Sequence, residues 1–273
     1  MVPWAIIAEN GLKTKTLISV ASNGIDTMQV EFPVKGAILA GGEGSRLLPF
    51  TNYTHKTLLP VYDKPVIDYA LKTMRESGVM DISIVGNKHL GQIEQHVGKG
   101  NAREKIHYIT EEKALGVGNA LQLIRPIVEG SRILLYFSDN ITTWNFSQDV
   151  ERFMQSKEAP GCVLLAREVK DPSSFGICEF DEMGNIVDIE EKPISPKSNI
   201  AIGGIYLFDE SFWIKFDNAI SSDKEEFSIS NVTRQYVLEG KASIRNLGEG
   251  TWIDCGSPPS LLDASILARD GKI

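Results

Sequence analysis

From Val34 to Phe137 the chain alternates short apolar segments with amphipathic ones, and this alternation restricts the fold more than any other feature. Strands buried on both faces read as continuous apolar runs, and a helix between two neighbouring strands makes those strands parallel. The pattern therefore predicts an α/β fold with a mostly parallel central sheet covered by helices. The expected strands are Gly36–Ala40, Asp81–Val85, Lys105–Ile109 and Arg132–Phe137, and the expected helices are Val66–Ser77, Leu90–Val97 and Gly116–Ile124.

After about residue 160 the expected strands follow one another more closely. Strands are expected at Cys162–Arg167, Gly176–Phe180, Ile186–Glu190, Ala201–Phe208, Ala242–Asn246 and Thr251–Asp254, and helices at Ser228–Glu239 and Ser260–Ala268. No low-complexity segment, internal repeat or linker composition separates this part from the first. We therefore expect residues 35–273 to form one domain with a shared core.

Residues 1–34 have a different pattern. Three short runs favour strands, Trp4–Ala8, Thr14–Val20 and Ile25–Phe32, and Asn-Gly pairs lie between them. Asn-Gly between such runs is the strongest short-range signal for a hairpin. We expect a small N-terminal β meander outside the main domain. A structural appendage is the favoured interpretation, and a dimer contact or a regulatory flap are the alternatives.

The chain of 273 residues carries a formal net charge of −8, from 28 Lys and Arg against 36 Asp and Glu. Proteins that coat nucleic acid or anionic membranes need a basic face, so this charge argues against both partners. No apolar run approaches the roughly 20 residues of a membrane span, and the N-terminus lacks the basic region of a secretory signal. The three cysteines include no C-x-x-C pair, which argues against a disulfide framework or a zinc knuckle. We expect a cytoplasmic protein.

The clearest chemical signal follows the first strand of the main domain, in Gly41-Gly42-Glu43-Gly44-Ser45-Arg46. Glycine tolerates positive φ and lets backbone N–H groups approach a ligand without a Cβ in the way, so consecutive amides can form an anion site. Arg46 adds a planar cation that suits phosphate oxygens. The loop is not a Walker A motif, and it lacks the third glycine spacing of a dinucleotide fingerprint. We favour phosphate binding over the simpler alternative, a tight turn with a surface arginine.

A second basic element lies at Lys56, in His55-Lys56-Thr57-Leu58-Leu59-Pro60. Apolar neighbours would partly desolvate its ammonium group and strengthen its attraction for phosphate. Taken alone, Lys56 reads as an ordinary surface lysine, so its assignment depends on the motifs around it.

Several motifs in order resemble the sugar-1-phosphate nucleotidylyltransferases, most of all the short glucose-1-phosphate thymidylyltransferases. They are the glycine loop with Arg46-Leu47-Leu48-Pro49, Lys56-Thr57-Leu58-Leu59-Pro60-Val61, Ser138-Asp139-Asn140, Phe175-Gly176-Ile177-Cys178-Glu179-Phe180-Asp181, Glu190-Glu191-Lys192-Pro193 and Trp252-Ile253-Asp254-Cys255-Gly256. The resemblance runs from Lys35 to about Ala268. It implies a Rossmann-like three-layer nucleotidyltransferase fold for residues 35–273.

The resemblance also implies a reaction. A sugar 1-phosphate oxygen attacks the α-phosphorus of a nucleoside triphosphate, with dTTP or UTP and glucose 1-phosphate favoured, and pyrophosphate leaves. Asp139 and Asp254 would hold Mg²⁺, which takes one or two carboxylates together with phosphate oxygens and water. Arg46 and Lys56 would neutralise the triphosphate and Lys192 the sugar phosphate. The expected catalytic residues are Arg46, Lys56, Asp139 and Lys192.

Contacts with both substrates follow from the same resemblance. The nucleotide is expected to contact Leu39, Gly41, Gly42, Glu43, Gly44, Ser45, Arg46, Glu111 and Gly116, and the sugar phosphate Gly176, Glu191, Lys192 and Gly203. The four histidines form no evident cluster, which fits a reaction whose nucleophile is already an anion. A homo-oligomer is expected.

Glu111 departs from the family pattern, because it stands where the resemblance implies a base-reading glutamine. A Gln amide donates to O4 and accepts from N3–H of thymine or uracil, whereas an ionised Glu only accepts. A carboxylate would suit the amino groups of guanine or cytosine better. A GTP- or CTP-using enzyme, acting on another sugar phosphate or on a non-sugar phosphate or phosphonate, is therefore an alternative.

A non-catalytic sugar-nucleotide sensor or regulatory subunit is an alternative of another class. A sensor need not keep the metal and leaving-group residues. Arg46, Lys56, Asp139, Lys192 and Asp254 are all present, and they favour the enzyme.

Overall fold

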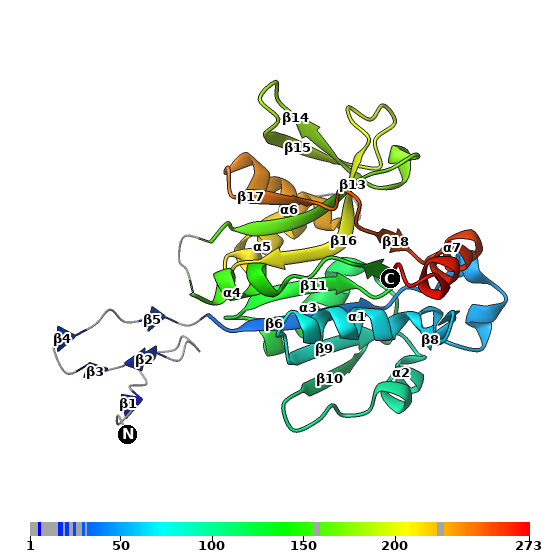
Figure 1. Cartoon of the computed structure of the whole chain (residues 1–273), viewed down its shortest axis with the longest axis horizontal. Coiled ribbons are helices and arrows are strands. Elements are labelled where there is room, and N and C mark those ends of the chain that lie inside the picture. The colour runs from blue at the N-terminus through cyan, green and yellow to red at the C-terminus, as the bar shows by residue number, and fades with distance from the viewer. Residues whose placement is uncertain are drawn as a thin grey trace.

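The structure is a computed structural model that describes residues 32–155, 159–222 and 227–273, together with the backbone of short strands before residue 32. At its centre lies a nine-stranded sheet whose main path runs β10-β9-β6-β11-β16-β13-β17 (Figure 1). The strands of this path are β6 (Val34–Ala40), β9 (Asp81–Gly86), β10 (Lys105–Thr110), β11 (Arg132–Phe137), β13 (Cys162–Glu168), β16 (Ile200–Phe208) and β17 (Ala242–Asn246). On this path only β16 runs antiparallel to its neighbours, which confirms the mostly parallel sheet. A hairpin of β14 (Gly176–Phe180) and β15 (Ile186–Glu191) extends from β16.

Helices cover both faces of the sheet. One face is covered by α1 (Val66–Glu76), α2 (Leu90–Val97) and α4 (Ser147–Gln155), and the other by α3 (Val117–Val128), α5 (Phe212–Ser222) and α6 (Ile229–Leu238). Strand β6 shows the alternation that links the layers, because Ile38 packs into the first core and Ala37 and Leu39 into the second. The predicted three-layer, Rossmann-like arrangement is confirmed.

The order of the strands creates a switch point beside β6. After β6 the chain builds β9 and then β10 on one side, and it returns to place β11 on the other side. Ligands of open α/β sheets bind at such a point, outside the carboxyl ends of the strands. The glycine loop follows β6 and Asp139 follows β11, so both lie at this edge.

Smaller elements complete this end of the molecule. Short strands β12 (Asn140–Thr142) and β18 (Trp252–Asp254) pair with each other, as do β7 (Pro60–Val61) and β8 (Lys64–Pro65). Helix α7 (Pro258–Arg269) packs on β7, and a small third core joins them through residues such as Val61, Ile141 and Ala264. Short 3₁₀ helices span Ser45–Leu47, Phe50–Asn52, Lys56–Leu58 and Pro172–Ser174.

Before residue 32 the described backbone contains five short strands. β1 (Ala5–Ile6), β2 (Thr16–Ile18) and β5 (Gln29–Val30) form an antiparallel sheet in that order, and β3 (Val20–Ala21) pairs with β4 (Gly24–Ile25). These three sheet strands fall within the three expected runs. The first Asn-Gly pair, at residues 10 and 11, lies outside the described residues, and of the second pair only Gly24 is described, at the start of β4. The boundary at residues 34 and 35 and the role of the segment stay predictions.

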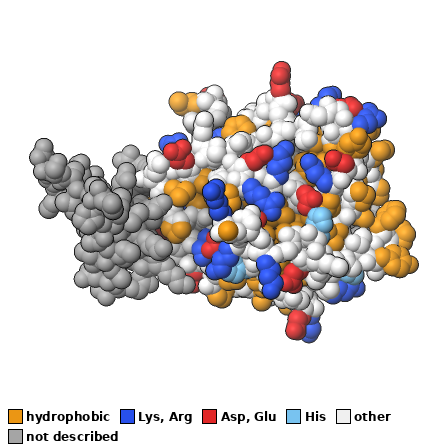
Figure 2. All heavy atoms as spheres, turned by 60° about the horizontal axis from the view of Figure 1, so that its bottom comes forward, with side chains coloured by type: hydrophobic (Ala, Val, Ile, Leu, Met, Phe, Trp, Pro, Cys, Tyr) orange, Lys and Arg blue, Asp and Glu red, His pale blue; other side chains and the backbone are white. Residues whose placement is uncertain are grey.

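Charges and helix lengths bear on the expected partners. On the face drawn in Figure 2, Lys and Arg side chains are interspersed with Asp and Glu side chains. Among the helices of the described residues, none has the length and apolarity that crossing a bilayer requires.

Candidate active site

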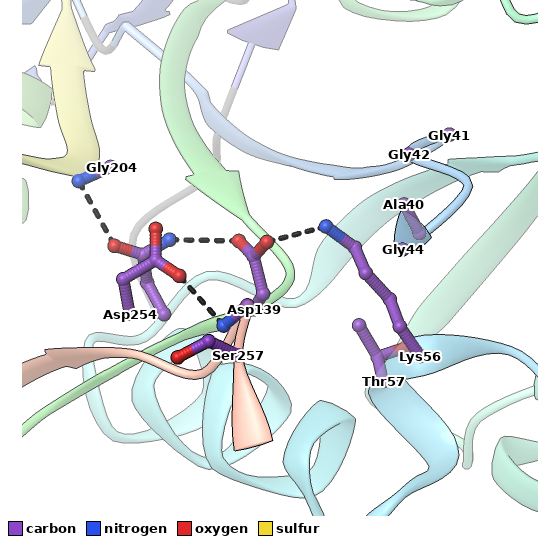
Figure 3. Close-up of polar contacts among 12 residues, drawn as sticks. Ala40, Gly41, Gly42, Gly44, Lys56, Thr57, Asp139, Gly204, Asp254 and Ser257 are labelled. Atoms are coloured by element: carbon purple, nitrogen blue, oxygen red, sulfur yellow. Dashed lines mark hydrogen bonds and ion pairs between the residues drawn. The ribbon is translucent and has the colours of Figure 1, made fainter. Parts of the chain in front are cut away.

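Asp139 and Asp254 come together because two short strands pair. Asp139 follows β11, and Asp254 ends β18, where it lies opposite Asn140 of β12 in the antiparallel register. The backbone N–H of Cys255 donates to the Asp139 carbonyl at 2.7 Å, which closes the pair beyond the last register position. Figure 3 shows the two carboxylates side by side, with Lys56 approaching Asp139 from the far side.

Both oxygens of the Asp139 carboxylate have a partner. Oδ2 pairs with the Lys56 ammonium group, and Oδ1 accepts a hydrogen bond from Asn140 Nδ2 at 3.0 Å. Burial alone would raise the pKa of Asp139, but the charge and hydrogen bond of Lys56 outweigh it and hold this pKa below its usual value. Asp139 is therefore an anion in the site.

The pKa of Asp254 shifts in the opposite direction, above its usual value. Burial raises its pKa, the negative charge of Asp139 raises it further, and the Gly256 N–H at 2.7 Å and the charges of Arg46 and Lys56 only partly offset this. The Arg46 guanidinium lies over Gly256, with Nη2 2.5 Å from where a Cβ on that glycine would stand. Within the described ranges, no carboxylate forms an ion pair with Arg46.

The two carboxylates fit a hard divalent cation. Asp139 already attracts an ammonium group, and burial and the neighbouring Asp139 charge together raise the pKa of Asp254, so a cation bound between the two carboxylates would favour the ionised form of Asp254. In the described part of the chain no group of three or more His, Cys, Asp or Glu could hold a metal. A cation here would depend on phosphate oxygens and water for its remaining ligands, as Mg²⁺ commonly does.

Thr51 and Lys56 pack against the glycine loop and leave no space for side chains at two of its positions. Gly44 adopts φ 67°, and a Cβ there would stand 2.8 Å from Thr51 Cγ2. A Cβ on Gly42 would stand 3.0 Å from Lys56 Nζ. Larger residues at these two positions would displace the loop or the lysine, so the glycines set the distance between backbone and cation.

His55 attaches the Lys56 segment to the end of β6. Its Nε2 lies 2.6 Å from the Ala40 carbonyl oxygen, which can only accept, so Nε2 carries the proton. Nδ1 then accepts from the Thr57 N–H at 3.1 Å. Desolvation by burial lowers the pKa of His55 to about 4, so its ring is neutral near pH 7.

A cavity of about 490 Å³ opens beside the carboxylates. Its lining includes Gly116, Asp139, Gly176, Glu191, Lys192, Gly204, Trp252 and Asp254. Glu191 Oε2 accepts from Ser230 Oγ at 2.6 Å, while Oε1 lies 3.9 Å from Lys192 Nζ. Lys192 has φ 46°, an unusual conformation for a side-chain-bearing residue that can signal a functional constraint. The volume suits a sugar phosphate.

A second cavity of about 280 Å³ lies on the other side of the glycine loop, and Glu43, Ser45 and Glu111 line it. Glu111 Oε1 accepts from Asn119 Nδ2 at 2.8 Å and from the Leu115 N–H at 3.3 Å, and Oε2 lies against Gly41. The side chain is 3% exposed, so it joins the glycine loop to the start of α3.

The expected site residues thus fall into three groups. Arg46, Lys56, Asp139 and Asp254 meet at one place, and Glu43, Ser45 and Glu111 line the smaller cavity. The larger cavity is lined by three residues expected at the sugar phosphate, Gly176, Glu191 and Lys192, and also by Gly116, which was expected at the nucleotide. Leu39 packs its side chain into the core. Gly203 lies against the Trp252 indole, and its neighbour Gly204 lines the larger cavity.

Sequence reasoning did not single out three residues of this arrangement, Asn140, Gly204 and Trp252. Asn140 and Trp252 stand in motifs quoted above, directly after Asp139 and two residues before Asp254, and Gly204 follows Gly203, an expected sugar contact. These positions were the signal, whereas the contacts of Asn140 with Gly204 and Trp252 span 64 and 112 residues of sequence.

Comparisons with known proteins agree with this geometry. The profile of the nucleotidyl transferase family matches residues 35–270. A low-salt glycan biosynthesis nucleotidyltransferase of Haloferax volcanii is 32% identical over 241 residues, which cover 88% of this chain and 67% of that protein. A glucose-1-phosphate thymidylyltransferase of Mycobacterium tuberculosis is 33% identical over 240 residues, covering 86% and 82%.

Solved structures also superpose on this chain over most of its length. A Bacillus anthracis protein assigned as a glucose-1-phosphate thymidylyltransferase, crystallised with a sucrose, superposes with a TM-score of 0.79 at 34% identity and covers 87% of this chain and 96% of its own. A UDP-glucose pyrophosphorylase complexed with UDP-glucose shares the fold, with a TM-score of 0.75 at 20% identity over 88% of this chain and 99% of its own.

Proposed function

This chain belongs to the nucleotidyl transferase family, and from that premise we propose that it joins a nucleoside triphosphate to a sugar 1-phosphate and releases pyrophosphate. The observation that carries the proposal is the meeting of Asp139, Asp254, Lys56 and Arg46 at the switch point of the sheet, beside a cavity large enough for a sugar phosphate.

In the proposed reaction, a phosphate oxygen of the sugar 1-phosphate attacks the α-phosphorus. The new P–O bond forms as the bond from the α-phosphorus to the bridging oxygen breaks, and that oxygen leaves with pyrophosphate. Both reactants are anions, so the protein must align them and offset their repulsion. Lys56, which pairs with Asp139, and Arg46, which lies near Gly256, would offset the charge of the triphosphate. Lys192, which lines the larger cavity (called the sugar-side cavity below), would offset the charge of the sugar phosphate.

Asp139 and Asp254 would hold Mg²⁺, because the β12–β18 pair brings the two carboxylates together and each raises the local demand for a positive charge. Bound there, Mg²⁺ would neutralise charge on the phosphate oxygens. The protein's own contribution is to hold the two carboxylates in place through the β12–β18 pair.

For the substrates, we favour dTTP or UTP and glucose 1-phosphate, on the support of relatives named glucose-1-phosphate thymidylyltransferases. Glu111 supports GTP or CTP as the second candidate, because a buried carboxylate accepts from amino groups but cannot donate to O4. Glu111 Oε1 already accepts hydrogen bonds from Asn119 and Leu115. These bonds hold the start of α3 whichever base is bound, so they are compatible with either candidate.

A pyrophosphate-release assay with ATP, GTP, CTP, UTP and dTTP, glucose 1-phosphate and Mg²⁺ tests the proposal. We expect release with one pyrimidine triphosphate preferred, and a loss of at least about a hundredfold in Asp139→Ala, since it removes a cation ligand. Asp270→Ala, which removes an exposed carboxylate beyond α7, is the control and should keep full activity. Turnover retained by Asp139→Ala would contradict its role, and preference for GTP or CTP would favour the second candidate.

A further inference from the structure

Asn140 makes three hydrogen bonds at the centre of the site. Its Oδ1 accepts from the Trp252 Nε1–H at 2.6 Å and from the Gly204 N–H at 3.1 Å, and its Nδ2 donates to Asp139 Oδ1 at 3.0 Å. The side chain is 2% exposed. One buried amide therefore joins the Asp139 carboxylate to the Trp252 indole, which lines the sugar-side cavity, and to the backbone of β16 at Gly204.

The orientation of this amide is determined by its partners. Two N–H groups point at one end, so that end is the oxygen, and the –NH₂ end must face the carboxylate of Asp139. A flipped amide would set donor against donor at Trp252 and Gly204 and acceptor against acceptor at Asp139. Trp252 and Gly204 thus act on Asp139 through Asn140.

Glycine at position 204 is required by the same arrangement. A Cβ on Gly204 would stand 2.8 to 2.9 Å from the Asn140 amide atoms, and a Cβ on Gly203 would stand 3.1 Å from Trp252 Nε1. Real Cβ atoms essentially never come within 2.9 Å of another heavy atom, and 3.1 Å is tighter than most of their contacts. A side chain at Gly204 would therefore displace the amide, and one at Gly203 would press on the indole.

We propose that Asn140 is a positioning residue that fixes the Asp139 carboxylate relative to the sugar-side cavity, and that Gly204 and Trp252 hold Asn140 for this task. Lys56 bonds Oδ2 of Asp139 and Asn140 bonds Oδ1, so the lysine and the amide together fix the carboxylate plane. Lys56 is a flexible cation that phosphate can attract, whereas Asn140 is itself 2% exposed and bonds the residue directly before it in the chain. Asn140 then keeps Asp139 aligned while substrates bind.

Asn140→Asp tests the proposal most directly. The new side chain keeps an oxygen for Trp252 and Gly204 but replaces the donor that faces Asp139 with a second acceptor. We expect kcat of pyrophosphate release to fall roughly ten- to a hundredfold, the range for losing a hydrogen bond to a charged group. KM for the sugar phosphate should change less than about threefold, because the indole contact is retained.

Gly204→Ala makes the same test without changing Asn140 itself, because its Cβ would push the amide aside. Here kcat should fall and KM for the sugar phosphate should also rise. Gly91→Ala is the matched control, since nothing lies within 4 Å of a Cβ at that exposed position of α2, and it should keep wild-type kinetics. If Asn140→Asp does not fold, Asn140→Ser removes the amide donor without adding a charge.

A second readout does not depend on turnover. The four tryptophans give separate indole ¹H–¹⁵N signals in labelled protein, and Trp252→Phe assigns the one from Trp252. We expect that signal to be protected from solvent exchange in the wild type and Asn140→Asp, and to lose protection in Gly204→Ala. A solvent-exchanging Trp252 signal in the wild type would overturn the proposal.

The inference rests on the proposed function, and wild-type turnover separates the two. A wild type that releases no pyrophosphate contradicts the function, while the indole signals still test the hydrogen-bond network. An active wild type whose kcat is unchanged in both Asn140→Asp and Gly204→Ala overturns the positioning role.

Discussion

Asp254 stands in surroundings that disfavour its own charge. Burial and the neighbouring Asp139 raise its pKa, so part of the folded state's free energy is spent on holding two like charges together. Asp254→Asn keeps an oxygen for the Gly256 N–H and removes the repulsion. In chelator-containing buffer we expect urea unfolding to show a gain of up to about 1 kcal/mol in stability, while pyrophosphate release collapses.

The comparison variant is Asp254→Ala, which relieves the same repulsion but leaves the Gly256 N–H without its acceptor. It should gain less stability than Asp254→Asn, because an unpaired buried donor is costly. If Asp254→Asn is less stable than the wild type without metal, the repulsion inferred here is wrong.

His55 predicts a pH dependence of stability. Its pKa is about 4 in the folded protein against 6.5 as an unperturbed group, so between these values the unfolded chain binds more protons. Stability from this residue is therefore present above pH 6.5 and is lost as the pH falls toward 4. Between pH 7 and pH 5 we expect it to account for a loss of about 2 kcal/mol in the free energy of unfolding.

Carboxylates titrate over part of the same range, so the measurement is a difference. Urea unfolding of wild type and His55→Gln at pH 7 and pH 5 isolates the histidine, since Gln can donate to the Ala40 carbonyl but does not ionise. The variant should lose less stability on acidification. Parallel pH dependences in the two proteins would show that His55 titrates normally.

At the scale of elements, apolar periodicity predicted what lies in the sheet. Leu90–Val97, Arg132–Phe137, Gly176–Phe180 and Ala242–Asn246 have the expected bounds, and Gly78 follows α1 with φ 77° as a C-terminal glycine should. Strand β11 is recognisable because the sheet buries it on both faces, so it reads as a continuous apolar run. Helix α2 is recognisable because its buried residues, Leu90 and Ile93, lie on one face of the helix.

The sequence pattern did not predict helices α4 and α5, and the reasons differ. In α4 the buried positions are few, and one of them is Asp149, which pairs with Arg245 of β17. In α5 the start is apolar nearly all round, so a 3.6-residue period does not stand out. Helix α3 was expected to end at Ile124 but runs to Val128, since Pro126 in its last turn costs few helical hydrogen bonds and Val128 is buried.

At the scale of the whole molecule, the sequence singled out residues that the structure brings together, such as Asp139 and Asp254, but not the contacts that hold them there. Strand ends at a switch point gave the neighbourhood of the glycine loop and Asp139, and the motif resemblance gave Lys56 and Asp254. The Lys56–Asp139 and Asn140–Trp252 contacts join residues 83 and 112 positions apart. Sequence periodicity carries no information on such pairs, because it reports only which face of its own element a residue occupies.

The division of the chain at residues 34 and 35 leads to the last prediction, for a chain that begins at Phe32. The contacts that join residues 32–34 to the sheet are kept. The Phe32 N–H donates to the Met154 carbonyl at 3.1 Å, the Arg132 guanidinium lies 3.9 Å from the Phe32 ring centroid, and β6 pairs with β11 from Val34 onward. Because the family match begins at residue 35, we expect kcat/KM within about twofold of the full chain and an unfolding free energy within about 0.5 kcal/mol. A chain that begins at Ala37 is the matched control, and it should fold poorly, since it removes the first three residues of a central strand.

Light scattering of the Phe32 chain distinguishes the alternatives for residues 1–31. Fewer copies per particle with kinetics preserved identifies a contact between copies. Altered kinetics at an unchanged number of copies identifies a segment that acts on the active site.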